Sequence, residues 1–254
     1  MKTLVVNNQK GGVGKTMLAV HTAWYLAEAG ARVAAIDLDP QGNASWTLAG
    51  AGQGVSSADL FFSEAAAPDR AEGLVLLPAD RRLDGVDTDL AASVLRFREN
   101  YSRLSERFDY AVIDTPPTWS GRNYAALMVA TTLVSPIDLE TYALQGVKQL
   151  WAQKAAVEKA ARRGRPIDFL GLLPSRFVSN SPRQRANLQA LLTAQGPQLL
   201  VPGHAVLTQR QGYAEALDLK TPVWTIRKSA AQDAGREIRV VLDTIKARLD
   251  VLPA

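Results

Sequence analysis

The chain has 254 residues and no cysteine, which excludes disulfides, thiolate metal sites, iron–sulfur clusters and cysteine nucleophiles. No apolar run approaches the roughly 20 residues of a membrane-spanning helix, and the polar residues near the start exclude a secretory signal, so a cytoplasmic protein is expected. The net charge of +4 splits into −5 over residues 1–144 (12 Lys+Arg, 17 Asp+Glu) and +9 over residues 145–254 (17 and 8). The basic half suggests contact with a polyanion, either nucleic acid or an anionic membrane, unless the excess is only a solvated surface.

Short apolar runs alternate along the chain with longer helical patterns. The runs predict strands at 4–6, 33–36, 74–77, 110–113, 133–136 and 169–173, with short edge strands at 199–201 and 223–224. The helical patterns predict helices at 15–29, 90–108, 144–163, 183–195 and 230–249, while the Gly/Ala stretch 50–54 is expected to be a loop. Strands buried on both faces and separated by helices predict one α/β domain over residues 1–254, with a doubly wound, mostly parallel sheet and helices on both faces.

A glycine-rich segment, 8–16, lies between the first strand and the first helix. Its three glycines let the backbone turn tightly and aim successive N–H groups at phosphate oxygens, and the helix that follows adds its positive end. Lys15 is placed to reach the β- and γ-phosphates, and Thr16 to ligate Mg²⁺. The common phosphate-loop pattern requires glycine where Gln9 stands, so the loop is a variant with an extra lysine, Lys10. The alternative, a turn that only caps the helix, is disfavoured by the Lys-Thr ending after a buried strand.

Three motifs carry a resemblance to a known family. The segment 10–16, Lys-Gly-Gly-Val-Gly-Lys-Thr, resembles the deviant Walker A loop of the ParA/MinD superfamily of ATPases. The segment 37–43 resembles the switch that follows the second strand in the ParA/Soj branch, and 111–117 resembles the Walker B strand and second switch of that branch. The resemblance reaches the last helix. It implies a deviant Walker P-loop ATPase fold, ATP and Mg²⁺ as cofactors, and weak ATP hydrolysis that a partner stimulates.

The resemblance also assigns roles to single residues. The nucleotide-binding set is Lys10, Gly11, Gly12, Val13, Gly14, Lys15, Thr16 and Met17, with Pro202 near the adenine. Mg²⁺ is bound by Thr16 directly and by Asp114 through water, with Asp37 supporting either the metal or the switch. Asp39 orients the attacking water, as phosphoryl transfer to water requires. The alternative is that Asp37, Asp39 and Asp114 only cap turns at strand ends.

Lys10 has no evident task within one subunit, because Lys15 already neutralises the phosphates. In the family the matching lysine crosses to the phosphates of a partner, so the resemblance implies an ATP-sandwich homodimer. Met17 stands where relatives usually carry a second Thr, which removes a hydroxyl from the α-phosphate but leaves the backbone N–H.

The basic half contains five candidate DNA contacts: Arg183, Arg185, Arg210, Arg227 and Lys228. Nonspecific DNA binding is largely phosphate neutralisation, so scattered cations on one face suffice. The first strand begins within a few residues of Met1, so no N-terminal helix-turn-helix domain is expected. The cluster of Arg162, Arg163 and Arg165 is interpreted as complementing a helix dipole.

The leading hypothesis is a ParA-type partition ATPase, nucleoid-associated, with a ParB-like centromere-binding or cargo-adaptor protein as its partner. One alternative is a membrane-cycling ATPase of the MinD kind, which would require a separate basic amphipathic tail, whereas we expect the apolar and basic segment 240–254 to be the last helix of the α/β domain itself. The other is a metabolic phosphate-loop ligase of the dethiobiotin synthetase kind, against which the Asp-Leu-Asp-Pro-Gln-Gly segment argues.

Overall fold

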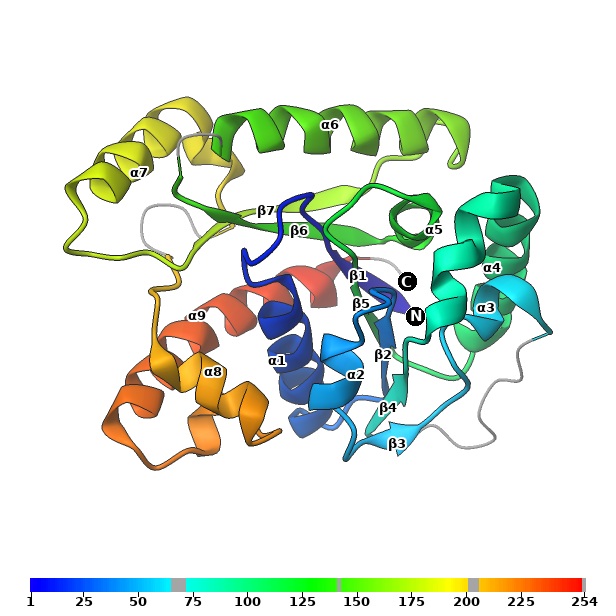
Figure 1. Ribbon diagram of the computed structural model, residues 1–254, viewed down its shortest axis with the longest axis horizontal. Helices are drawn as coiled ribbons and strands as arrows, with labels where there is room; N and C mark the ends of the chain where they lie inside the picture. Colours follow the sequence, from blue (N-terminus) through cyan, green and yellow to red (C-terminus); the bar gives the residue numbers. More distant parts are fainter. Residues whose placement is uncertain (65–71, 141–142, 201–205, 253–254) are drawn as a thin grey trace.

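The fold is that of a computed structural model, which describes residues 1–64, 72–140, 143–200 and 206–252. Within them one seven-stranded sheet has the order β3-β4-β2-β5-β1-β6-β7, and every neighbouring pair is parallel (Figure 1). The strands are β1 (Lys2–Val6), β2 (Val33–Asp37), β3 (Gly52–Gln53), β4 (Leu74–Leu77), β5 (Tyr110–Asp114), β6 (Thr132–Asp138) and β7 (Asp168–Ser175). The predicted doubly wound α/β fold is confirmed.

Helices cover both faces of the sheet. The α-helices are α1 (Lys15–Glu28), α2 (Asn43–Thr47), α3 (Asp59–Phe62), α4 (Leu90–Leu104), α5 (Gly121–Val129), α6 (Ala143–Ala160), α7 (Pro182–Gln195), α8 (Gln211–Asp218) and α9 (Ser229–Val251). Shorter 3₁₀ turns are η1 (Arg81–Asp89), η2 (Gly196–Gln198) and η3 (Val223–Thr225). Because parallel strands need crossover connections, nearly every strand is followed by a helix that returns the chain to the same edge.

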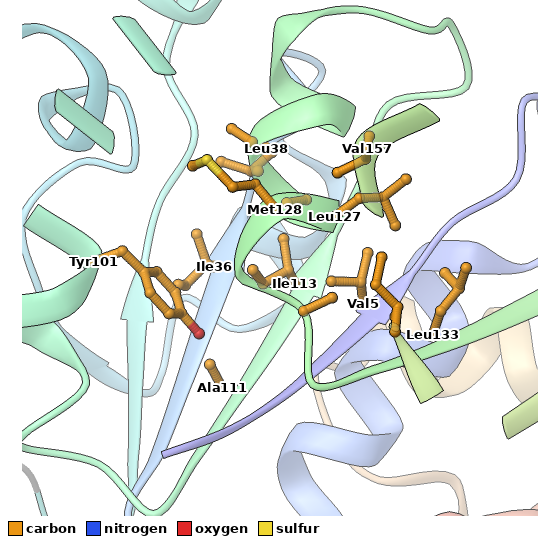
Figure 2. Packing of buried hydrophobic residues seen from close by; sticks show 14 of the residues in the cluster. Val5, Ile36, Leu38, Tyr101, Ala111, Ile113, Leu127, Met128, Leu133 and Val157 are labelled. Carbon is orange, nitrogen blue, oxygen red and sulfur yellow. The ribbon is translucent and has the colours of Figure 1, made fainter. Parts of the chain in front are cut away.

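Side chains alternate along each strand and divide the core into two layers. Val5, Ile36 and Ile113 point to the face covered by α3, α4, α5 and α6, where Leu127 and Val157 pack against them (Figure 2). Their chain neighbours, such as Leu4 and Val112, point to the opposite face, where α1, α8 and α9 pack. The centres of both layers are shielded from solvent, because these side chains are at most 2% exposed.

Several predicted boundaries are wrong, for local reasons. The expected strand 223–224 is the 3₁₀ turn η3, since the Val223 N–H donates to the buried side chain of His21 rather than to a neighbouring strand. The expected loop 50–54 contains β3, where a Cβ on Gly52 would lie 3.3 Å from the Leu74 carbonyl oxygen of the adjacent strand. The expected helix 90–108 ends at Leu104.

Other elements were only partly predicted. The expected strand 199–201 is a single bridge from Leu199 to Leu172, and residue 201 lies outside the described residues. The sequence did not predict α2, α3, α5 or α8, which are short. Within the described ranges, no helix is both long enough and apolar enough to span a membrane.

Candidate nucleotide-binding site

The site lies where β1, β2 and β5 end. Val6, Asp37 and Asp114 occupy the same level of the sheet, since Asp114 is in register with both of the others. From β1 the chain crosses to β2 on one side of the sheet, whereas from β5 it crosses to β6 on the other side. The direction of the strand order therefore reverses beside β1. Such a switch opens a crevice at the carboxyl ends of the strands, where open α/β sheets bind ligands.

The glycine-rich loop turns between β1 and α1 at this crevice. Gly12 and Gly14 adopt left-handed backbone conformations, with φ of 73° and 93°, which a side chain would strain. Beside the loop is a pocket of about 510 Å³. The pocket is lined by Gly11, Gly12, Gly14, Lys15, Thr16, Met17, Asp39, Gln41, Asn43, Trp46, Thr47, Pro117, Leu217 and Asp218. The structure thus brings most of the predicted nucleotide-binding residues to one cavity.

Lys15 is buried beneath the loop. Its Nζ donates to the carbonyl oxygen of Lys10 at 2.9 Å, which ties the start of the loop to its end. Burial lowers the pKa of Lys15, while the nearby carboxylates of Asp114 and Asp39 act to raise it. A desolvated ammonium held in place at a phosphate-sized cradle attracts anions strongly, because little water has to be removed from it.

Thr16 and Asp114 form the candidate magnesium site. The Thr16 hydroxyl donates to Asp114 Oδ2 at 2.7 Å, and the other oxygen, Oδ1, is buried with no hydrogen-bond partner among the described residues. Burial and the neighbouring charge of Asp37 raise the pKa of Asp114. An acceptor oxygen left bare in this way is suited to a metal-bound water.

The donor set matches magnesium. The described part of the chain holds no group of three or more His, Asp or Glu that would bind a metal by itself. Mg²⁺ in nucleotide sites needs only one or two protein oxygens, since phosphates and waters complete its shell. The residues present therefore fit a nucleotide-bound Mg²⁺, with Thr16 and Asp114 as the protein's share.

Asp37 and Asp39 have different surroundings. Asp37 is fully buried and accepts hydrogen bonds from the Ser45 N–H at 2.8 Å, the Ser45 hydroxyl at 2.7 Å and the Asp39 N–H at 3.0 Å. Burial raises the pKa of Asp37. Asp39 accepts from the Gln41 N–H at 3.1 Å and lines the pocket. Asp37 thus holds the switch segment together, and of the two carboxylates only Asp39 faces the pocket.

Lys10 points away from the nucleotide pocket. Its Nζ pairs with Asp138 Oδ2 of β6 at 2.5 Å, and its side chain remains 49% exposed. It is not among the lining residues of the pocket, unlike Lys15. The two loop lysines therefore have different environments: Lys15 lines the nucleotide pocket, and Lys10 lies outside it beside Asp138.

Sequence reasoning missed three residues of the site. Asn8 fastens the loop to β6, since its side chain accepts from the Lys10 N–H at 2.9 Å and donates to the Pro136 carbonyl at 2.9 Å. Its only sequence signal was a polar pair directly after the first strand. Trp46 of α2 is 51% exposed and lines the pocket, with the Lys220 ammonium 4.3 Å from its ring centroid. Arg176, after β7, donates to the loop at Gly12.

The candidate DNA contacts lie on α7 and at the starts of α8 and α9. Three of the five already pair with carboxylates of the same chain: Arg183 with Glu140, Arg210 with Glu237 and Asp233, and Lys228 with Glu215. Arg185 and Arg227 form no ion pair with the described residues. Arg210 also lines a groove of about 720 Å³ between the segment after β7 and α8. Pro202, expected near the adenine, lies outside the described residues.

The chain matches known proteins over its length. The family model described as "AAA domain" matches residues 1–164. Protein IncC of Escherichia coli is 36% identical over 258 residues, covering 99% of this chain and 70% of that protein. The chromosome-partitioning ATPase Soj of Thermus thermophilus is 39% identical over 159 residues, covering 60% of this chain and 61% of Soj.

The fold matches solved structures of the same kind. The ATP complex of a McdA variant from Cyanothece superposes with a TM-score of 0.80 at 23% identity, covering 97% of this chain and 96% of that one. Structures that share the fold hold ATP, or ADP with Mg²⁺. The pocket of this chain, with Lys15, Thr16 and the adjoining Asp114, fits the same ligands, ATP and Mg²⁺. With its loop, switch and Walker B motifs joined at one pocket, the chain belongs to the ParA/MinD-type family of deviant Walker A ATPases.

Proposed function

We propose that this ATPase is a partition switch of the ParA kind, which forms an ATP-sandwich homodimer and binds DNA without sequence preference. A ParB-like partner bound to plasmid, chromosome or other cargo stimulates hydrolysis and releases the dimer from DNA. The protein works in the cytoplasm, on the nucleoid. IncC and Soj, the relatives that share its sequence, support this proposal.

The observation that carries the proposal is the placement of Lys10. A lysine at the tip of a phosphate loop, half exposed and turned away from its own pocket, is available to a second molecule. Its ion pair with Asp138 is partly exposed, and such pairs contribute only about 0–1 kcal/mol. A phosphate of the partner's ATP would carry more negative charge than the Asp138 carboxylate and would lie in a less solvated interface. It would therefore displace Asp138 from Lys10 readily.

Within the subunit, Lys15, Thr16 and Asp114 bind the phosphates and metal, and Asp39 orients the attacking water. Bound Mg²⁺ supplies charge neutralisation at the phosphates. Asp39 is suited to this part because it lies two residues after β2 and lines the pocket, while both donors of Ser45 go to Asp37. Asp37 keeps that segment in place through its three hydrogen bonds.

DNA binding is proposed for the face formed by α7 and the starts of α8 and α9. Arg185 and Arg227, which pair with no carboxylate in the described part of the chain, can bind phosphate at once, whereas Arg183, Arg210 and Lys228 must first exchange a carboxylate. A single subunit therefore offers few free cations, and two subunits joined by ATP offer twice as many. This makes DNA affinity depend on the nucleotide.

A gel shift on two unrelated duplexes tests the proposal, with ATP, ADP or no nucleotide and across a salt series. Binding is expected with ATP only, equally on both duplexes, and log affinity is expected to fall with log salt by about 0.9 per neutralised phosphate. Arg227→Ala should weaken binding on both duplexes and flatten the slope. Arg103→Ala, on α4, is the matched control. Equal binding in all three nucleotide states contradicts the proposal, and vesicle binding with ATP would favour a membrane-cycling ATPase.

A further inference from the structure

Arg176 has an unusual backbone conformation beside the phosphate loop. It is the first residue after β7 and has φ of +56°, in the left-handed region. This conformation costs a residue with a side chain roughly 1–2 kcal/mol relative to ordinary backbone. Strain of this kind persists where the surroundings require it, and it justifies asking what the side chain does.

The side chain of Arg176 lies against the loop. Its Nη1 donates to the carbonyl oxygen of Gly12 at 2.8 Å. A Cβ on Gly12 would lie 3.2 Å from the same nitrogen, so the absence of a side chain there permits the contact. No carboxylate among the described residues pairs with Arg176, so no opposite charge competes with the Gly12 carbonyl for its guanidinium.

The contact has a consequence for the next amide. Every described peptide bond of the chain is trans, and a trans peptide holds its C=O and N–H antiparallel. When the guanidinium fixes the Gly12 carbonyl on one side of the loop, it also fixes the Val13 N–H on the other. We propose that Arg176 is a positioning residue for ATP binding, which braces the loop from outside so that the Val13 N–H is aimed at the phosphates before the nucleotide arrives.

The contact of Arg176 with the loop matters for binding because a glycine-rich loop has many accessible backbone conformations unless other residues hold it. Gly11, Gly12 and Gly14 each lose more conformational freedom on ordering than any other residue type. Lys15 holds the loop from inside through the Lys10 carbonyl, and Arg176 holds it from outside through the Gly12 carbonyl. Since the loop is already ordered, less of the binding energy of ATP is spent on ordering it.

The test combines nucleotide affinity with amide exchange. Arg176→Met removes the guanidinium and keeps most of the length, and Arg176→Gly removes it while also relieving the backbone strain. Both should bind a fluorescent ATP analogue and a fluorescent ADP analogue about tenfold more weakly, as a lost charged hydrogen bond predicts. Arg176→Lys, which keeps charge and one donor, should recover part of the affinity. Arg163→Met is the control, because Arg163 also has positive φ (54°) but lies after α6, away from the loop.

The second measurement is hydrogen exchange at the Val13 amide in the nucleotide-free protein. Exchange should be several-fold faster in Arg176→Met than in the wild type and unchanged in Arg163→Met. Full ATP affinity in Arg176→Gly would overturn the proposal, since the contact of the guanidinium with the loop would then contribute nothing to binding. Weaker binding with unchanged Val13 exchange would also overturn it, by showing that the guanidinium acts on the nucleotide directly. Both measurements concern the single subunit, so their outcome is independent of dimer formation and DNA binding.

Discussion

The Thr16 hydroxyl and the Asp114 carboxylate are joined by a hydrogen bond of 2.7 Å across the floor of the nucleotide pocket. The bond links Thr16, the second residue of α1, to Asp114, the last residue of β5, and the two are 98 positions apart in the chain. Because the carboxylate is buried, its charge is costly until a cation reaches it. Mg²⁺ bound with ATP would offset this cost by placing positive charge beside the carboxylate.

Asp114→Asn should separate that penalty from metal binding. The neutral amide removes the buried charge, so the nucleotide-free protein should become more stable by about 1 kcal/mol. Stabilisation by ATP with Mg²⁺ should fall sharply, since the amide binds a metal-bound water more weakly. Thermal melting with and without Mg²⁺·ATP measures both effects. An equal melting shift in wild type and variant would mean that Asp114 does not hold the metal.

Lys10→Ala should leave ATP binding by the single subunit nearly intact and abolish the ATP-dependent dimer. The reason is that Lys10 lies outside its own pocket, while Lys15 remains inside it. Light scattering with a nonhydrolysable ATP analogue measures the mass. Asp138→Asn, which loses the same ion pair but keeps the lysine, is the control and should still dimerise. A Lys10→Ala dimer of normal affinity would contradict the proposed role.

Asp39→Ala should produce an ATP-bound dimer that stays on DNA. Asp39 faces the pocket, so its loss removes the group that orients water, whereas the buried Asp37 continues to hold the switch through Ser45. Hydrolysis should fall by at least about a hundredfold, the usual scale for a positioned acid or base. Phosphate release and a DNA pull-down in the same sample measure it. Hydrolysis at the wild-type rate would remove Asp39 from the reaction.

His21 should make stability depend on pH between about 4 and 6.5. Burial among the rings of Trp24, Tyr213 and Trp224 lowers the pKa of His21 to about 4. In this range the unfolded chain binds a proton that the folded chain excludes, so the free energy of unfolding falls as the pH falls, by up to about 3 kcal/mol.

The buried carboxylates of Asp37 and Asp114 act in the opposite sense, because their pKa values are raised in the fold. The difference between wild type and His21→Gln therefore isolates the histidine. Urea unfolding of both proteins at pH 7.5 and pH 5 measures it. The wild type should lose more stability on acidification than the variant, and parallel losses would assign the pH dependence to other groups.

The elements predicted from sequence are those with strong local patterns. The central strands β1, β2 and β5 are nearly continuous apolar runs, so they were placed to within about two residues. The loop residues Gly12, Gly14 and Lys15 were predicted for the same reason, since their chemistry is written in consecutive positions. Asp39 and Asp114 were predicted from the resemblance of segments 37–43 and 111–117 to the family's switch and Walker B motifs.

The missed features depend on contacts between distant segments. The Val223 N–H reaches His21 across 202 positions, and no local pattern distinguishes η3 from an edge strand. Likewise, the pairing of Lys10 with Asp138 and the contact of Arg176 with Gly12 arise from the order of strands β1, β6 and β7 in the sheet. Ion pairs that neutralise Arg183 and Lys228 are also invisible to a count of charges.

Trp46 gives the protein a built-in optical signal. Its indole lies half exposed at the pocket and beneath the Lys220 ammonium, an environment unlike that of Trp24 and Trp224 in the aromatic cluster around His21. The emission of an indole depends on the charges and the water around it. Binding of a nucleotide in this pocket would therefore shift the fluorescence of the unlabelled protein, and Trp46→Phe would silence the change while leaving the other four tryptophans.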